Sequence, residues 1–213
     1  MSSTDSQLHL GTSLTSLANQ PSTLRYAPGV HLTPLQQYHV CLVFDLFQAK
    51  GTWAKIEEGL AENAVYEDLF ATAKNRVEVA GQFLGLPIVT TKSETISHEI
   101  IAVKPATAAQ VQPDATTITS TSSKISEIDV KVHQKFSFKP LGNVVNMHST
   151  LVVFSDEESG KILRIQDRPM EEIPENSLIT MLRKVNAVVA PKILGIPPTS
   201  EKEDHEKFES RHA

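Results

Sequence analysis

The sequence predicts an α+β protein in which N-terminal helices pack against a cone-shaped, curved antiparallel sheet, with one more helix at the C-terminal end. Two observations predict this class. Up to about residue 84 the apolar residues recur at helical spacing, and from about Thr95 they alternate with polar residues at period two. Helices followed by a run of strands are typical of α+β rather than βαβ proteins. A twisted sheet covered by helices on one face leaves an open mouth, where we expect a pocket.

The first helix has a clear start signal. Thr33 is a good N-cap, Pro34 suits the first helical position, and Gln36 completes a capping box. We expect Gly51 to end this helix in the left-handed conformation. Thr52 is then expected to cap a second, short helix.

The second helix and the segments after it follow from spacing. Trp53, Ile56 and Leu60 fall on one helical face. A short extended piece is expected at 64–68. A third helix is expected at 76–84, where Gly and Pro residues follow.

Four strands follow at period two, and a helical stripe closes the pattern. The strands are expected at 95–103, 125–138, 144–154 and 161–168, and the last helix at 175–189.

The chain of 213 residues fits a single domain. We place it at 33–198, after a disordered N-terminal arm at 1–32 and before a charged C-terminal tail at 199–213. Within the domain, 105–124 is rich in Thr, Ser and Ala, has no periodicity, and is expected to be a flexible loop.

Composition narrows the class of partner. The net charge of −5 argues against nucleic acid, because phosphate binding needs a basic face. No apolar run approaches the ~20 residues that span a bilayer, and no signal peptide is recognised, so we expect a cytoplasmic protein without a membrane partner. The single cysteine, Cys41, lies in an apolar run and is expected to be a buried free thiol. Metal, phosphate and dinucleotide motifs are absent from the sequence, so no metal or cofactor is expected.

Two segments resemble a known family. The run from Trp53 to Asp68, followed by Arg76-Val77 and a helix ending in Phe83-Leu84, is similar to the start of SnoaL-like domains. The run from Gly160 to Asp167 is similar to the closing strand of those domains. The chain thus resembles the SnoaL-like branch of the nuclear transport factor 2-like superfamily over roughly residues 35 to 170.

The resemblance implies a fold more firmly than a function. The superfamily includes isomerases, dehydratases, cyclases, hydrolases, binding proteins and adaptors, so the fold does not choose among them. Homodimers through the exposed sheet face are expected by analogy. The sequence also departs from those relatives, because Arg168-Pro169 follow Asp167 where an aromatic residue often stands two places after the Asp. No catalytic set carries over.

Strand parity selects Asp167 as the leading site residue. It shares a face with Leu163 and Ile165, so a carboxylate continues an apolar face. A buried carboxylate is costly unless it has a reason, such as service as a general base. The alternative is a structural role, in strand-end capping or in a salt bridge to a neighbouring arginine.

Parity also marks polar residues on the other strands. Gln134 is the one polar member of the even, core-facing positions of 128–138, whereas His133 is expected at the surface. An inward His98 or His148 could pair with Asp167 as an acid or base, and Asn146 shares the face of His148. For each histidine the alternative is a satisfied core residue.

Three further residues complete the candidate set. Tyr66 could donate to an oxyanion, a role that the resemblance to steroid isomerases suggests, and Asp68 follows it at the end of the extended piece. The alternatives are a half-buried tyrosine and a turn or helix cap. Trp53 is a candidate pocket residue, with a core position as its alternative.

These residues are compatible with three functions. The first is a cofactor-free lyase, isomerase or cyclase that acts on a small apolar metabolite, with Asp167 as base and Tyr66 or a histidine as its partner. The second is a protein that binds a small ligand without chemistry. The third is a dimeric interaction module.

Overall fold

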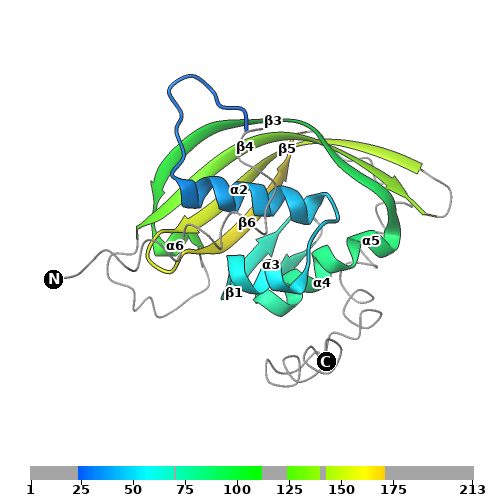
Figure 1. Ribbon diagram of the computed structural model, residues 1–213, viewed down its shortest axis with the longest axis horizontal. Coiled ribbons are helices and arrows are strands. Elements are labelled where there is room, and N and C mark those ends of the chain that lie inside the picture. Colours follow the sequence, from blue (N-terminus) through cyan, green and yellow to red (C-terminus); the bar gives the residue numbers. More distant parts are fainter. Residues whose placement is uncertain (1–23, 70, 112–123, 140–142, 171–213) are drawn as a thin grey trace.

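The computed structural model describes residues 24–69, 71–111, 124–139 and 143–170. A curved sheet wraps around helix α2, and the other long helices lie on the same side of the sheet (Figure 1). The helices are α2 (Pro34–Phe47), α3 (Trp53–Gly59), α4 (Arg76–Leu84), α5 (Leu86–Val89) and α6 (Ala108–Val111). The strands are β1 (Leu60–Glu67), β2 (Thr72–Ala73), β3 (Thr90–Ala106), β4 (Ile125–Phe138), β5 (Asn143–Asp156) and β6 (Lys161–Pro169).

The sheet has the strand order β2-β1-β6-β5-β4-β3. Strands β3 to β6 form the antiparallel meander expected from the sequence. The sheet as a whole is mixed, because β1 pairs with β6 in parallel. This parallel pair joins the helical first half of the chain to its last described strand, so residues about 100 positions apart become neighbours.

Helix α2 begins as predicted and ends differently. Thr33 accepts a hydrogen bond from the backbone N–H of Gln36, and the Gln36 side chain accepts one from the backbone N–H of Thr33. The prediction that Gly51 ends the helix in the left-handed conformation was wrong: Ala49 has a φ of 59° and takes that place. Nearly the whole helix surface is buried, because the curved sheet encloses it.

The elements after α2 match the predicted order, with longer strands. Thr52 caps α3 as expected, but Leu60 begins strand β1 rather than continuing the helix. Helix α4 has the predicted bounds, and a single turn, α5, follows Gly85 at once. Strand β3 begins at Thr90 instead of at residue 95.

Bulges decide which side chains point inward. Register shifts interrupt β3 between Thr95 and Ser97, and the β5–β6 pairing shifts near Phe154. A bulge moves the following residues to the opposite face. Leu163 therefore packs on the outer face, although the predicted alternation placed it inward with Ile165.

Two apolar clusters hold the fold together. The main core lies between the helices and the concave face of the sheet. A smaller cluster of Val111, Ile125, Val152 and Phe154 lies on the convex face. Its Val111 comes from α6, so the segment expected as a loop at 105–124 begins with the end of β3 and a helical turn.

The described part of the N-terminal segment is attached to the sheet. Tyr26 forms a parallel bridge with Ile100, and the backbone N–H of Ala27 donates to the carbonyl of Ile100 at 2.9 Å. Strand β3 is an edge strand, and this bridge satisfies part of its free edge. The end of the expected arm at 1–32 is therefore ordered by backbone pairing.

The remaining expectations fall outside the described residues or concern the membrane. The helix expected at 175–189 and the tail at 199–213 lie outside the described ranges. None of the helices within those ranges is long and apolar enough to cross a membrane.

Candidate functional site

A cavity of about 110 Å³ lies between the concave face of the sheet and the helices α4 and α5. Its lining is apolar for the most part, with Asp68, Asp167, Tyr66 and Gln82 as polar members. The apolar lining residues are Phe47, Leu69, Phe83, Leu86, Val89, Phe136, Phe138, Val145, Met147 and Pro169.

Asp167 is the buried carboxyl group of this cavity. Its parity on β6 with Ile165 turns it toward the core, and only 6% of its surface is exposed. Its Oδ1 atom has no hydrogen-bond partner among the described residues. Ser149 on β5 lies close to Asp167 and acts to lower the pKa of its carboxyl group. The distance and angle between the two side chains nevertheless do not meet the criteria of a hydrogen bond. Burial, with the charge of Asp68, raises the pKa of Asp167 to about 6.

Tyr66 and Asp68 form a hydrogen-bonded pair beside Asp167. The Tyr66 hydroxyl donates to Asp68 Oδ2 at 3.0 Å, and the backbone N–H of Ala71 donates to Asp68 Oδ1 at 2.7 Å. Burial, and then the charges of Asp68 and Asp167, hold the pKa of Tyr66 well above its ordinary value of 10. The tyrosine is therefore neutral, and its proton is directed toward Asp68.

Aromatic rings form one wall of the cavity. The rings of Tyr66 and Phe83 lie 4.9 Å apart, and those of Phe47 and Phe83 lie 5.1 Å apart, both in edge-on arrangements. Such contacts restrict the rotation of the rings. This wall holds the Tyr66 ring in place, and with it the direction of the hydroxyl.

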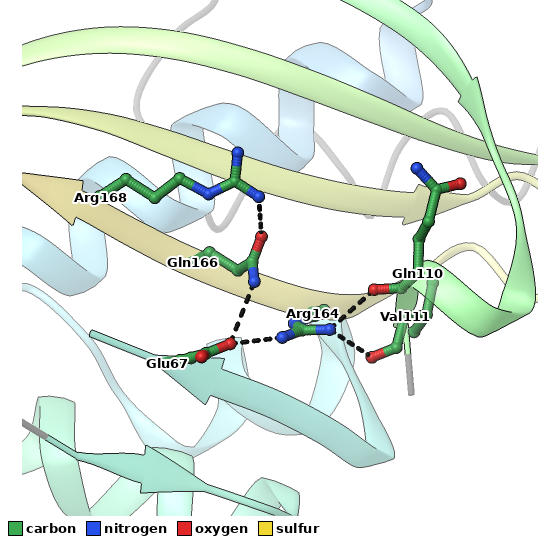
Figure 2. A network of polar contacts seen from close by, with 6 residues as sticks. All are labelled: Glu67, Gln110, Val111, Arg164, Gln166 and Arg168. Carbon is green, nitrogen blue, oxygen red and sulfur yellow. Dashed lines mark hydrogen bonds and ion pairs between the residues drawn. The ribbon is translucent and has the colours of Figure 1, made fainter. Parts of the chain in front are cut away.

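A polar network on the opposite face fixes the two strands that carry the site. Figure 2 shows Glu67 of β1 bound to Arg164 and Gln166 of β6. Arg164 also donates to the carbonyls of Gln110 and Val111 in α6, at 2.7 and 3.3 Å. Because side chains alternate along a strand, Glu67 lies between Tyr66 and Asp68 but on the other face. The network thus sets the alignment of these residues with Asp167.

The structure separates His148 and Asn146 from Asp167. Both side chains are exposed on the convex face, where the His148 ring lies 4.2 Å from that of His133, and Asn146 Oδ1 lies 3.3 Å from His133 Nε2. The expected pairing of His148 with Asp167 was wrong. On β5 the inward positions are Val145, Met147 and Ser149, a parity that the mixed apolar pattern of this strand concealed.

Three other candidate residues lie away from the cavity, where they pack or form hydrogen bonds within the fold. His98 packs against Phe44, with ring centroids 4.8 Å apart, and accepts a hydrogen bond from the backbone of Arg25. Gln134 is buried as predicted and accepts a hydrogen bond from Thr95 at 3.1 Å. Trp53 packs against the main core. None of these three side chains lines the cavity.

Sequence reasoning missed most of the apolar lining. Phe136 and Phe138 were recognised as core-facing, but nothing in the pattern distinguished a filled core from a cavity wall. The contributions of Phe47 and Phe83 depend on how α2 and α4 pack, which is a tertiary property. The useful signal was the inward parity of Asp167 next to these apolar positions.

The described residues show no cluster suited to a metal ion. No group of three or more His, Cys, Asp or Glu side chains with the required proximity occurs within the described ranges.

Comparisons with known proteins give structural likeness alone. No protein-family model matches the chain, and no curated protein does. Similar solved structures include a nuclear transport factor 2-like superfamily protein from Salmonella enterica, which is 9% identical with a TM-score of 0.43. That match covers 65% of this chain and 91% of the other.

Two further solved structures are similar to this chain. A nuclear transport factor 2-like protein of unknown function from Exiguobacterium sp. 255-15 is 15% identical, with a TM-score of 0.41, and the match covers 63% of this chain and 99% of the other. A candidate SnoaL-like polyketide cyclase from Jannaschia sp. CCS1 is 14% identical, with a TM-score of 0.35, and the match covers 75% and 99%. Because the superpositions are loose, the fold described above rests on this chain's own strand order and register.

Proposed function

We propose that the protein binds a small, largely apolar molecule in the cavity and that Asp167 exchanges a proton with it, without a cofactor. One observation carries the proposal: a buried carboxyl group without a hydrogen-bond partner at Oδ1 faces an apolar cavity. Burying a carboxylate without compensation costs several kcal/mol, so such a group is more common at functional sites than in structural cores.

The pKa of Asp167 suits an acid–base role near neutral pH. An efficient general base has a pKa close to the working pH, and burial raises the pKa of this carboxyl to about 6. At pH 7 most molecules then carry an ionised Asp167, which is a stronger base than an ordinary aspartate.

Binding without chemistry is the second candidate, and the state of Tyr66 favours it. Because the Tyr66 hydroxyl already donates to Asp68, it does not stand ready to stabilise an oxyanion. An enzyme of the steroid-isomerase kind needs such a donor. The two candidates therefore differ in whether Asp167 alone drives proton transfer.

A fragment experiment tests the proposal. Neutral and charged compounds of about five to seven non-hydrogen atoms suit a cavity of this size, given that a cavity of ~150 Å³ holds benzene. Binding would be followed by NMR through the methyl group of Met147, which lines the cavity. Bound compounds would then be incubated in deuterated water, and the exchange of their carbon-bound hydrogens would be measured.

Three variants separate the outcomes. In a proton-transfer site, exchange depends on Asp167 and falls about 100-fold or more in Asp167→Asn, while the exposed control Glu99→Gln leaves it unchanged. Val145→Phe, which fills part of the cavity, abolishes binding. Binding without exchange in the wild type would establish the second candidate, and shifts at Met147 that persist in Val145→Phe would contradict the cavity as the site.

A further inference from the structure

Asp167 is an acceptor that lacks a donor within the described part of the chain. Only 6% of its surface is exposed, and its Oδ1 atom has no hydrogen-bond partner there. Ser149 lies beside it and is fully buried, but does not form a hydrogen bond with it. The Tyr66 hydroxyl lines the same cavity and donates to Asp68 instead. An ionised Asp167 is therefore stabilised by a molecule in the cavity that supplies a donor.

The rest of the lining limits how polar that molecule can be. Besides Asp167, the polar members of the lining are Tyr66, Asp68 and Gln82, and all the others are apolar. An apolar wall offers no hydrogen bond to a polar group that leaves water, so each further polar group on a ligand is destabilising. The lining thus matches a molecule with one donor for Asp167 and an otherwise apolar body.

The size of the cavity favours a hydroxyl group as the donor. A volume of about 110 Å³ leaves room for a small molecule alone, given that a cavity of ~150 Å³ holds benzene. A hydroxyl adds a single non-hydrogen atom, whereas an amide adds several and brings an acceptor that an ionised Asp167 repels. An O–H donor also forms a shorter bond to a carboxylate than an N–H donor does, at about 2.5–2.7 Å.

We propose that the ligand of this cavity is a small neutral molecule with an apolar body and one hydroxyl group, which donates a hydrogen bond to the Asp167 carboxylate. This inference rests on the proposed function, because it takes the cavity as the ligand site and names the class of molecule that fills it. An alcohol is a much weaker acid than a carboxylic acid, so the hydrogen stays on the ligand. A carboxylate has two acceptor oxygens, so this bond leaves one of them for proton exchange.

Two probes of the same size test whether the site selects a donor. Cyclopentanol and cyclopentanone have the same ring and the same number of non-hydrogen atoms, but the alcohol can donate a hydrogen bond and the ketone can only accept one. Each would be titrated into the full chain at pH 7.5, with the Met147 methyl resonance reporting occupancy. We expect cyclopentanol to bind at least about tenfold more tightly, because only its O–H group pairs with an ionised carboxylate.

Two variants locate the preference. Asp167→Asn keeps the size of the side chain, and its amide both donates and accepts, so it can pair with either probe. The two affinities are therefore expected to come within about threefold of each other in this variant. Glu99→Gln makes the corresponding change at an exposed position of β3 and is expected to alter neither affinity.

The pH dependence gives a second test. The titratable groups that line the cavity with Asp167 are Tyr66 and Asp68, both at the end of β1, and the described parts of α2, α4, α5, β4 and β5 add none to the lining. Neither probe ionises between pH 7.5 and 5, whereas the raised pKa of Asp167 means that it takes up a proton as the pH falls through about 6. A protonated carboxyl can donate to a ketone. The preference for cyclopentanol is therefore expected to narrow as the pH falls, because cyclopentanone binds more tightly.

The outcomes separate this inference from the function on which it rests. Equal affinity for the two probes at pH 7.5, a preference for cyclopentanone, or a preference for cyclopentanol that persists in Asp167→Asn would overturn the hydroxyl ligand while leaving the cavity as a ligand site. A lack of any response at Met147 to both probes and to the wider fragment set would overturn both.

Discussion

Asp167 combines three properties that rarely occur together in one carboxyl group. It is buried, its Oδ1 has no hydrogen-bond partner among the described residues, and it faces a cavity rather than filled core. A structural carboxylate would instead be paired, as Asp45 is with Lys55 at 2.6 Å. The difference between these two aspartates is the main residue-scale support for a functional site.

The Asp167→Asn variant should be more stable than the wild type at pH 7. The pKa of this carboxyl is raised from 3.8 to about 6, so its ionised form destabilises the folded state above pH 6. This cost decreases as the pH falls below 6 and is lost below about 3.8, where the unfolded chain also binds the proton. We expect a gain of about 1–3 kcal/mol at pH 7 and a much smaller gain at pH 4, measured by urea unfolding. A loss of stability at pH 7 would show that Asp167 is a structural partner.

The sequence identified only some of the site residues, because the inward or outward direction of a single side chain can be predicted only where the strand alternates clearly between apolar and polar residues. Asp167, Tyr66 and Asp68 were found because each continues or ends a recognisable strand. His148 and Asn146 were misplaced because both faces of β5 carry apolar residues, so parity could not be read from the pattern. The outer face is apolar there because α6 covers Val152 and Phe154.

At the scale of elements, the alignment of β1 with β6 builds the site. The two strands pair in parallel, with Tyr66 opposite Ile165 and Glu67 opposite Gln166. Arg164 reinforces this alignment and also anchors α6 through two backbone carbonyls. One side chain therefore links the convex-face cluster to the strands that carry the cavity residues.

Replacing Arg164 should destabilise the protein more than replacing its exposed neighbour. Arg164→Met removes donors to two carbonyls and to Glu67, which should cost about 1–3 kcal/mol. Arg168→Met removes an exposed side chain and should change stability by less than about 0.5 kcal/mol. Both are measured by thermal unfolding, and equal effects would contradict an anchoring role for Arg164.

A close approach between α2 and α3 gives a second prediction at this scale. A Cβ atom on Gly59 would lie 2.0 Å from Cδ2 of Leu42, which is fully buried. Gly59→Ala should therefore cost about 1–3 kcal/mol through overpacking.

A double-mutant cycle shows whether this contact is the cause. Leu42→Ala should cost less in the Gly59→Ala background than in the wild type, because the smaller side chain relieves the clash. Additive effects of the two substitutions on the free energy of unfolding would contradict the assigned contact.

Element order was more predictable than element ends. The capping box of α2 and the bounds of α4 follow from local signals, which the chain carries within a few residues. The start of β3 at Thr90 and the parallel pairing of β1 depend on partners far away in the sequence. Local patterns do not contain that information, and bulges erase the alternation that would otherwise supply it.

For the whole molecule, His39 joins the helical layer to the sheet. It is fully buried on α2, with Nδ1 2.8 Å from Ser155 Oγ and Nε2 3.1 Å from the carbonyl of Gly160. The neutral ring can donate from Nε2 and accept at Nδ1. Burial lowers the pKa of His39 from 6.5 to about 4.

This histidine should make the fold sensitive to acid. Between pH 6.5 and 4 the unfolded chain binds a proton at this position that the folded chain does not, so stability falls as the pH falls. The loss amounts to at most about 3 kcal/mol. His39→Gln should be less stable than the wild type at pH 7 but should lose less on acidification, as measured by urea midpoints at several pH values. An unchanged acid dependence would contradict the assignment.

The fold class was predictable because it depends on patterns of apolar residues that repeat over many positions. Helical periodicity, then strand alternation, indicated helices on one face of a curved sheet, and the described residues have this arrangement. Whether the cone contains a cavity depends on differences of a few side-chain volumes, which no sequence pattern records. The sequence could therefore predict which face of the sheet carries the site, but not that this face borders a cavity.

An NMR titration of the Asp167 side-chain carboxyl in the full chain, with Asp167→Asn used to assign its resonance, tests the proposed base most directly. A buried base at this position has a midpoint near pH 6. A midpoint near the ordinary value of about 4 would mean that the carboxyl is solvated or paired, and the proposed proton transfer would lose its basis.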